Sequence, residues 1–301
     1  MSLSIFPKAL QKNNKIVIIA PSGRLVEGTI DFGVQTLESW GLQVYLSKYL
    51  QKGHHYFSGT DSERLHDLQE AIDNPEVAAI FCARGGYGIT RILDKVDFSS
   101  LKKQSKWVIG FSDITALHLK LYQLGLCSVH GVMPAGFEKA ESKSIESLKS
   151  VLFGEPIAYE FNSNQYNKEG KAKGKIIGGN LSLIVESLGT PSEVCFDHTI
   201  LFIEEIDEYR YKIDRMMMQL KRAGKLSHLA GLIVGHFSGT KDTLVPFGMT
   251  TEALILDHVS EYNFPIAFNI PIGHEPLNIA VPYSCECTLD VGEKVAINFK
   301  K

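Results

Sequence analysis

The sequence has no long hydrophobic run, no excess of one charge and few cysteines. No stretch approaches the roughly 18 apolar residues that cross a bilayer, so we expect no membrane-spanning segment. Lys and Arg number 31 and Asp and Glu number 34, which gives a formal net charge of −3. Without a basic field, neither nucleic acid nor a membrane surface is expected as a partner. The cysteines number 5 and lie mostly in apolar runs, which indicates a reducing compartment rather than a disulfide framework.

The first residues also lack the features of a secretory signal. Their one apolar run, Ile16 to Ala20, is too short and is followed by Pro21-Ser-Gly rather than by a small-residue cleavage site. We therefore expect a cytoplasmic protein. The length of 301 residues suggests two domains or one large one, and it allows a core that needs no disulfide or metal.

Strand and helix patterns alternate through the first half of the chain. Apolar runs predict strands at residues 15–20, 42–46, 77–82, 107–110 and 127–132. Helical patterns separate them, such as the stripe of Ile30, Val34, Leu37 and Trp40. The alternation predicts an α/β fold with a doubly wound, mostly parallel sheet, whose ligands bind beyond the carboxyl ends of the strands.

A polar, glycine- and lysine-rich stretch at 154–175 predicts a linker with one short strand. It would separate an N-terminal domain (1–153) from a C-terminal β/α domain (176–301). Within the second domain we expect strands and two longer helices, with an antiparallel, hairpin-like end. Their predicted ranges are 200–204, 232–235, 266–268, 285–290 and 294–299 for the strands, and 210–222 and 251–259 for the helices.

Ser112 lies between a short apolar strand and a helical pattern, the setting of a nucleophile elbow. Gly110 stands two residues before it, although Ile114 replaces the glycine usual two residues after it. The backbone N–H of Asp113 would then point toward a developing oxyanion. The local pattern alone favours a simpler alternative, in which Ser112 caps the helix.

Three further groups could take part in chemistry, and each has a structural alternative. Arg84-Gly-Gly-Tyr-Gly88 follows the third strand and is either a tight turn or a second oxyanion donor through Gly86. Glu204 ends an apolar strand, where a carboxylate caps a helix, faces solvent or orients a histidine. His274 lies in a rigid Gly/Pro loop, Pro271 to Pro276. No zinc-like spacing of histidines or cysteines is present, so no metal is expected.

Several segments, taken in order, resemble the LD-carboxypeptidase family of serine peptidases, which includes muramoyltetrapeptide carboxypeptidases and microcin C self-immunity peptidases. The resemblance extends from about residue 15 to the C-terminus. Its motifs are Ile19-Ala-Pro-Ser-Gly23, Ala83-Arg-Gly-Gly-Tyr-Gly88, Gly110-Phe-Ser-Asp-Ile-Thr-Ala-Leu-His118, His130-Gly131, Gly178-Gly-Asn-Leu-Ser182, Leu201-Phe-Ile-Glu-Glu205 with Ile213-Asp-Arg215, and Pro271-Ile-Gly-His274.

The resemblance implies a Ser–Glu–His triad, with Ser112 as nucleophile, Glu204 as orienting acid and His274 as general base. We take Glu204 rather than Glu205 because it is the first acid after the Leu-Phe-Ile run, and successive strand residues face opposite ways. The N–H groups of Gly86 and Asp113 would form the oxyanion hole. The candidate substrate-binding residues are Arg84, Tyr87 and Asn180, with Arg84 either binding a substrate carboxylate or serving as a structural ion-pair partner.

The family fold implies a swivelling C-terminal domain, a homodimer and no metal or organic cofactor. The implied activity is release of terminal D-alanine from a murein tetrapeptide during cell-wall recycling. One alternative is an immunity-type peptidase that cleaves an acyl-aspartyl nucleotide. That activity would favour stacking aromatics in the linker, which holds only Tyr159, Phe161 and Tyr166. A second alternative is a non-catalytic small-molecule-binding module.

Overall fold

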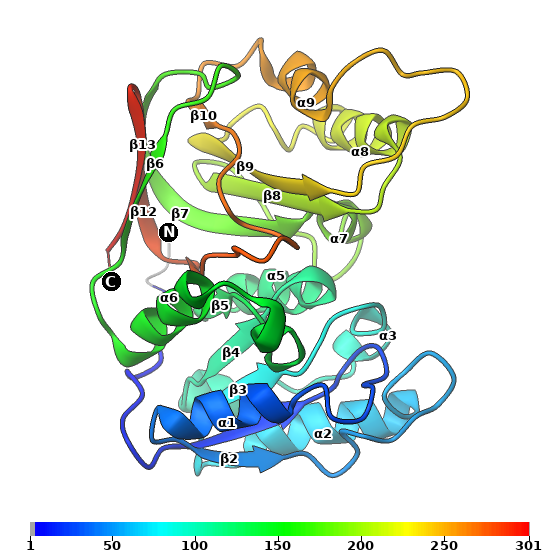
Figure 1. Cartoon of the computed structure of the whole chain (residues 1–301), viewed down its shortest axis with the longest axis vertical. Helices are drawn as coiled ribbons and strands as arrows, with labels where there is room; N and C mark the ends of the chain where they lie inside the picture. The colour runs from blue at the N-terminus through cyan, green and yellow to red at the C-terminus, as the bar shows by residue number, and fades with distance from the viewer. Residues whose placement is uncertain (1–3, 301) are drawn as a thin grey trace. The chain divides into compact units, whose positions relative to one another are not determined.

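The computed structural model describes residues 4–300, which fall into two units. The first unit holds residues 4–156 together with Pro276–Ser284, and the second holds Ile157–Glu275 together with 285–300. Strands and helices alternate through the first unit and strands dominate the second (Figure 1). Within the described residues, no helix is long and apolar enough to cross a membrane.

The first unit is built on a sheet of order β11-β5-β4-β3-β1-β2. Each neighbouring pair is parallel except β11 with β5. The strands are β1 (Lys15–Ile19), β2 (Gln43–Leu46), β3 (Val77–Cys82), β4 (Trp107–Gly110), β5 (Ser128–His130) and β11 (Val281–Tyr283). Strand order reverses between β1 and β3, so this is the topological switch point where doubly wound folds bind ligands. The predicted doubly wound sheet is confirmed.

Helices connect the strands of this unit. They are α1 (Asp31–Ser39), α2 (Asp61–Asp73), α3 (Thr90–Leu93), α4 (Ser99–Lys103), η1 (Ser112–Ile114), α5 (Thr115–Gln123), η2 (Pro134–Lys139) and α6 (Ser142–Phe153). Thr60 begins α2 with a capping box, in which its hydroxyl accepts from the Glu63 N–H and the Glu63 carboxylate accepts from the Thr60 N–H. The apolar face of α2 packs on β1 and β3, and β4 is buried along its whole length.

The second unit has a sheet of order β10-β9-β8-β7-β12-β13-β6. Its strands are β6 (Ala158–Asn162), β7 (Gly170–Asn180), β8 (Ile200–Ile206), β9 (Gly231–Ser238), β10 (Ile266–Ala267), β12 (Glu286–Val291) and β13 (Lys294–Lys300). The long strand β7 belongs to both halves of the sheet: residues 170–175 pair antiparallel with β12, and residues 176–180 pair parallel with β8. The predicted hairpin-like end is the β12–β13 pair.

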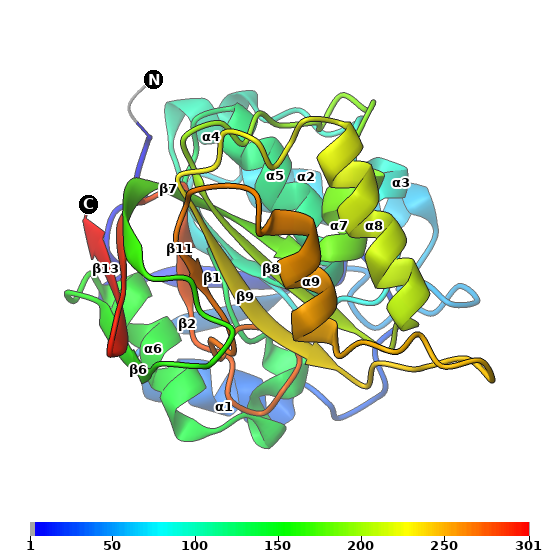
Figure 2. The same ribbon diagram turned by 90° about the horizontal axis from the view of Figure 1, so that it is seen from above.

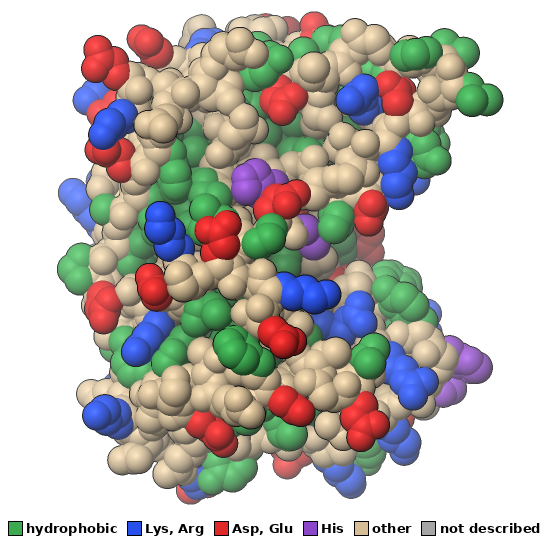
Figure 3. Space-filling view, viewed as in Figure 1, with side chains coloured by type: hydrophobic (Ala, Val, Ile, Leu, Met, Phe, Trp, Pro, Cys, Tyr) green, Lys and Arg blue, Asp and Glu red, His purple; other side chains and the backbone are tan. Residues whose placement is uncertain are grey.

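Three helices accompany this sheet, namely α7 (Leu181–Glu186), α8 (Arg210–Arg222) and α9 (Thr251–Val259). Helices α8 and α9 pack against each other alongside β8 and β9 (Figure 2). On the face seen in Figure 3, acidic and basic side chains are interspersed. This mixture fits the small net charge of −3.

The predicted domain boundaries differ from the two units in two places. The predicted linker, 154–175, contains β6 and the first half of β7, which join the second sheet. The predicted C-terminal domain included residues 276–284, whereas these residues belong to the first unit through β11. A three-residue strand that pairs with β5, far away in the sequence, leaves no periodic pattern from which to predict it.

Candidate active site

The turn after β4 holds Ser112 in a strained backbone conformation. Its φ of 62° lies in the left-handed region, which costs a non-glycine residue roughly 1–2 kcal/mol. The residue before it, Phe111, is fully extended, and η1 and α5 follow directly. A serine on a sharp, strained strand-to-helix turn is the geometry of a nucleophile elbow.

The alternative that Ser112 caps the helix does not fit this geometry. A capping residue has an extended backbone and accepts an N–H from the first turn through its side chain. Ser112 is instead the first residue of η1, whose cap position is Phe111, and the cap position of α5 is Ile114. Neither of these helix starts has a side-chain cap hydrogen bond.

Two glycines allow the chain to pass closely around Ser112. A Cβ on Gly110 would lie 2.8 Å from Cγ1 of Ile114, so the isoleucine occupies the space that a side chain at 110 would need. A Cβ on Gly85 would lie 3.2 Å from the Ser112 hydroxyl oxygen and 3.4 Å from the Asp113 nitrogen. The loop after β3 is therefore in close contact with the elbow at Gly85, the residue before the predicted oxyanion donor Gly86.

Asp113 ties the elbow to the loops after β1 and β3. Its side chain is 1% exposed, and its Oδ2 accepts hydrogen bonds from the Ser22 hydroxyl at 2.5 Å and from the Ile89 N–H at 3.0 Å. Arg64 of α2, also 1% exposed, donates to the carbonyls of Pro21 and Gly88. The burial of Arg64 was not predicted from the sequence, because one arginine in an amphipathic helix is normally expected on the solvated face.

The other predicted residues of this loop have visible structural contacts. Arg84 donates from Nη1 to the Arg24 carbonyl at 2.7 Å, which links the loops after β3 and β1. Tyr87 is 49% exposed, and its ring centroid lies 5.9 Å from that of Phe57. Gly86 has a φ of 104°, which only glycine adopts readily. These contacts hold the loop in place and do not identify a ligand.

The second unit brings together two of the predicted residues, Glu204 and His274. Nδ1 of His274 lies 2.7 Å from Oε2 of Glu204, whose side chain is fully buried. The register between β8 and β9 shifts between Ile203 and Glu205, and such irregularities redirect side chains. Gly273 has a φ of 140°, and a Cβ there would lie 3.3 Å from Oε2 of Glu204. A glycine therefore lets the histidine loop approach the carboxylate.

The surroundings of His274 raise its pKa. Burial lowers the pKa of this imidazole, but the hydrogen bond and charge of Glu204, with the charges of Glu205 and Asp207, outweigh that effect. A carboxylate at Nδ1 keeps the proton of the neutral ring on that nitrogen. Nε2 then carries the lone pair, as in the general base of a serine hydrolase.

Glu205 has a different set of partners from Glu204. One oxygen accepts from the Asn180 amide at 2.8 Å and the Ile206 N–H at 3.0 Å, and the other accepts from the N–H and hydroxyl of Ser182 at 2.8 and 2.7 Å. Burial nevertheless raises the pKa of Glu205. The Asn180 side chain also caps α7 by accepting from the Leu183 N–H.

Other histidines of the motifs lie in the core of the first unit. His118 is fully buried, with Nδ1 at 2.8 Å from the Ser128 hydroxyl and Nε2 at 2.9 Å from the Gly110 carbonyl. Burial lowers the pKa of His118 to about 4. His130 is also fully buried, and its ring lies 5.7 Å from that of Phe111. Across residues 4–300, no three or more His, Cys, Asp or Glu side chains gather as a metal site would require.

Both halves of the chain match known peptidase domains. Residues 16–131 match the family model of the LD-carboxypeptidase N-terminal domain. Residues 173–289 match that of the LD-carboxypeptidase C-terminal domain. These ranges contain Ser112 and the Glu204–His274 pair, respectively.

Individual proteins are similar over nearly their whole length. The "Probable murein peptide carboxypeptidase" of Bacillus subtilis (strain 168) is 37% identical over 302 residues, which cover 98% of this chain and 95% of that protein. The crystal structure of muramoyltetrapeptide carboxypeptidase from Oxalobacter formigenes has a TM-score of 0.88 at 28% identity, covering 95% of this chain and 99% of that chain. The microcin C7 self-immunity protein MccF, in complex with aspartyl sulfamoyl adenosine, has a TM-score of 0.89 at 19% identity, covering 100% and 99%. This last similarity concerns the fold.

Proposed function

The chain belongs to the LD-carboxypeptidase family of serine peptidases, and on that premise we propose that it releases terminal D-alanine from a murein tetrapeptide. The observation that carries the proposal is the strained backbone of Ser112, with its φ of 62°. Backbone strain of this kind persists only where the surrounding structure holds it, and at the end of a strand it fits a nucleophile that must be raised above the sheet. The bonded pair of Glu204 and His274 supplies the base that a serine requires.

In the proposed reaction, the Ser112 hydroxyl attacks the carbonyl carbon of the L,D-peptide bond while Nε2 of His274 takes its proton. The C–N bond then breaks, and the protonated imidazole gives the proton to the departing amino group of D-alanine. An ester to Ser112 remains. Water, activated by the same imidazole, hydrolyses that ester and releases the shortened peptide. Glu204 holds the ring and stabilises its positive charge at each step.

The tetrahedral intermediates carry a negative oxygen, which we assign to the backbone N–H groups of Asp113 and Gly86. The tight contact of Gly85 with the elbow supports this assignment, because it brings the two loops together. Losing one oxyanion donor typically costs about 3–4 kcal/mol of transition-state stabilisation. We keep Arg84, Tyr87 and Asn180 as candidate substrate contacts, with the structural contacts described above as their alternative roles.

The contacts of the 154–175 aromatics favour murein peptides over an aminoacyl nucleotide. The ring of Tyr159 lies 6.2 Å from that of Phe161 and 5.9 Å from that of Phe299. The Tyr166 ring lies 5.9 Å from that of Phe268. Each of these half-buried rings already has an aromatic neighbour in the second unit, which leaves less of its surface for stacking on a base.

The direct test measures D-alanine release from a purified murein tetrapeptide by mass spectrometry, with the wild type and Ser112→Ala side by side. We expect release by the wild type and none by the variant, since alanine removes only the nucleophile. Release by both would exclude Ser112 as nucleophile. Release by neither would shift the proposal to the acyl-aspartyl nucleotide, tested with the same two proteins.

The family also leads us to propose a homodimer in the cytoplasm. Sedimentation equilibrium of the purified protein, whose chain mass is 33.4 kDa, tests the dimer, and fractionation of the producing cells tests the compartment. A mass equal to that of a single chain at micromolar concentration would exclude the dimer.

A further inference from the structure

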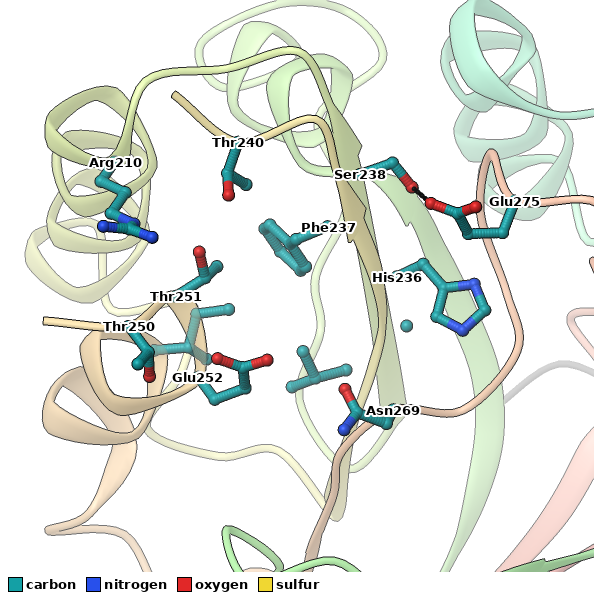
Figure 4. Close-up of a pocket in the computed structure, with 13 residues that line it drawn as sticks. Arg210, His236, Phe237, Ser238, Thr240, Thr250, Thr251, Glu252, Asn269 and Glu275 are labelled. Carbon is teal, nitrogen blue, oxygen red and sulfur yellow. Dashed lines mark hydrogen bonds between the residues drawn. The ribbon is translucent and has the colours of Figure 1, made fainter. Parts of the chain in front are cut away.

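The contacts that hold the two proposed catalytic groups differ in kind between the two units. In the second unit, Ser238 at the end of β9 donates a hydrogen bond of 2.6 Å to Glu275, the residue after His274 (Figure 4). This contact is exposed, so water can replace it at little cost. In the first unit, the contacts to the loops around Ser112 come from a buried cation, Arg64, whose side chain is 0% exposed.

The Arg64 guanidinium binds two backbone carbonyls and one carboxylate. Its Nη1 donates to the Pro21 carbonyl and, at 2.8 Å, to the Gly88 carbonyl, and its Nη2 donates to Asp61. Burial lowers the pKa of Arg64, while the charges of Asp61 and Asp113 oppose that effect. Because an arginine stays protonated in proteins, this buried charge requires partners in fixed positions.

The two carbonyls that Arg64 binds stand directly before the two groups that donate to Asp113. The Ser22 hydroxyl and the Ile89 N–H both donate to Oδ2 of Asp113, at 2.5 and 3.0 Å. Each donor belongs to the residue that follows one of the two carbonyls in the chain. Arg64 therefore fixes both donors, and through them the position of Asp113, whose backbone N–H we assign to the oxyanion hole.

The same guanidinium also holds the loop after β3. This loop, 84–88, contains Gly86, the second assigned oxyanion donor, and it ends at the Gly88 carbonyl that Arg64 binds. A Cβ on Gly88 would lie 2.9 Å from Nη1 of Arg64, so a glycine at this position lets the guanidinium approach. Both assigned oxyanion donors are thus connected to one buried side chain.

We propose that Arg64 is a positioning residue for the oxyanion hole, and that it holds the loops after β1 and β3 so that the N–H groups of Gly86 and Asp113 converge. The inference rests on the proposed function, because only a tetrahedral intermediate uses these donors. The positive charge of Arg64 also opposes that of the Asp113 carboxylate, which would repel a developing oxyanion. Arg64 acts through the loops rather than on a reacting atom, so its effect belongs to the transition state and not to substrate binding.

The test measures kcat and KM for D-alanine release by Arg64→Lys. Lysine keeps the charge, but its single ammonium cannot span both carbonyls and Asp61 as the planar guanidinium does. Small displacements of catalytic groups cost on the order of 100-fold in rate, so we expect kcat to fall by about 100-fold with KM unchanged. A wild-type kcat in the folded variant, or a loss confined to KM, would overturn the inference.

Arg91→Lys is the matched control, because Arg91 shares two neighbours with Arg64. It donates to both oxygens of Asp61 at 2.9 and 2.8 Å, and it lies 5.3 Å from the centroid of the Phe57 ring, compared with 4.8 Å for Arg64. Its side chain is 45% exposed, and its replacement leaves the bonds from Arg64 to the carbonyls in place. We expect a wild-type kcat. An equal loss in both variants would assign the effect to the shared neighbours and overturn the inference.

Ser22→Ala tests the same connection without disturbing the guanidinium. It removes one hydrogen bond to Oδ2 of Asp113 and should lower kcat by about 10-fold, the effect of one such bond, again with KM unchanged. Circular dichroism shows whether each variant is folded. If Arg64→Lys does not fold, a wild-type kcat in Ser22→Ala overturns the inference.

A fluorophosphonate probe separates this inference from the proposed function, because it requires a reactive serine but no peptide. The Ser112 oxygen bonds to phosphorus, fluoride leaves, the imidazole takes the serine proton, and the phosphoryl oxygen occupies the oxyanion hole. Mass spectrometry measures the labelling rate, which Arg64→Lys should reduce by the same factor as kcat.

The outcomes of the labelling experiment are distinct. If the wild type is labelled but releases no D-alanine, the proposed substrate is wrong, and slower labelling of Arg64→Lys still supports the inference. Equal labelling of the two proteins, with D-alanine release by the wild type, would overturn the inference and leave the peptidase function intact. A wild type that is neither labelled nor active would refute both.

Discussion

Replacing Glu204 with glutamine tests the proposed acid–base pair most directly. The change keeps the size of the side chain but removes a buried charge 2.7 Å from Nδ1 of His274. A hydrogen bond to a charged group contributes about 1.5–3 kcal/mol, which corresponds to about 1–2 pKa units. We therefore expect Glu204→Gln to lower the pKa of His274 by that amount. Activity should fall on the order of 10⁴-fold, as when the acid of a serine-protease triad becomes an amide.

The pH profile gives the sign of this effect. Below its pKa the His274 imidazole is protonated and cannot accept the Ser112 proton, so kcat/KM rises with pH through that pKa. In the wild type this rise should occur above the ordinary histidine value of about 6.5, because the neighbouring carboxylates raise the pKa of His274. In Glu204→Gln the residual activity should rise at lower pH.

Two measurements suffice. The first is kcat/KM for D-alanine release from pH 5 to 9, a range of about 2 pH units on either side of the His274 titration. The second is an NMR titration of His274 in the Ser112→Ala background. Glu205→Gln is the matched control, since Glu205 is 3% exposed and adjacent but bonded to other groups. It should destabilise the fold yet cost far less activity. If Glu205→Gln loses as much activity as Glu204→Gln, or if the pKa of His274 stays unchanged in Glu204→Gln, then Glu204 is not the orienting acid.

Two further substitutions test the elbow. In urea unfolding, Ser112→Gly should be more stable than Ser112→Ala by about 1 kcal/mol, because only glycine adopts the positive φ at this position without a steric cost. Equal stability of the two variants would contradict the strain. Gly110→Ala should destabilise by about 1–3 kcal/mol and reduce D-alanine release, since its Cβ would lie 2.8 Å from Ile114. Ile114→Ala should restore part of both losses in the double variant, and no restoration would mean that another contact is responsible.

The main strands of the first unit were predictable because each is a short apolar run bounded by glycine, proline or polar residues. The predicted runs at 77–82 and 107–110 coincide with β3 and β4. Strand β7 escaped prediction because its first half alternates lysine with small residues and its second half contains Gly178 and Gly179. Ile176 and Ile177 are the only β-branched residues of this strand, too short a run to predict it, and pairing with both β8 and β12 stabilises it.

The chemistry of the site was predictable in residue type but not in conformation. The sequence around Ser112 fits both a capped helix and an elbow, and only the sign of φ distinguishes them. The contact between Gly85 and Ser112 depends on how two loops fold against each other, which no local pattern records. Burial of Arg64 likewise depends on carbonyls that other segments supply, those of Pro21 and Gly88.

Glu204 and Glu205 are adjacent buried acids beside the proposed base His274, and the hydrogen bonds of Glu205 explain how the fold accommodates both. Two buried acids side by side would normally raise each other's pKa and favour protonation. Four donors from Asn180, Ser182 and Ile206 satisfy Glu205, so it can remain an acceptor. Its charge then adds to that of Glu204 in raising the pKa of His274. Asn180 therefore has a structural reason to stand at the end of β7, since its amide supports the acid next to the one that orients the proposed base.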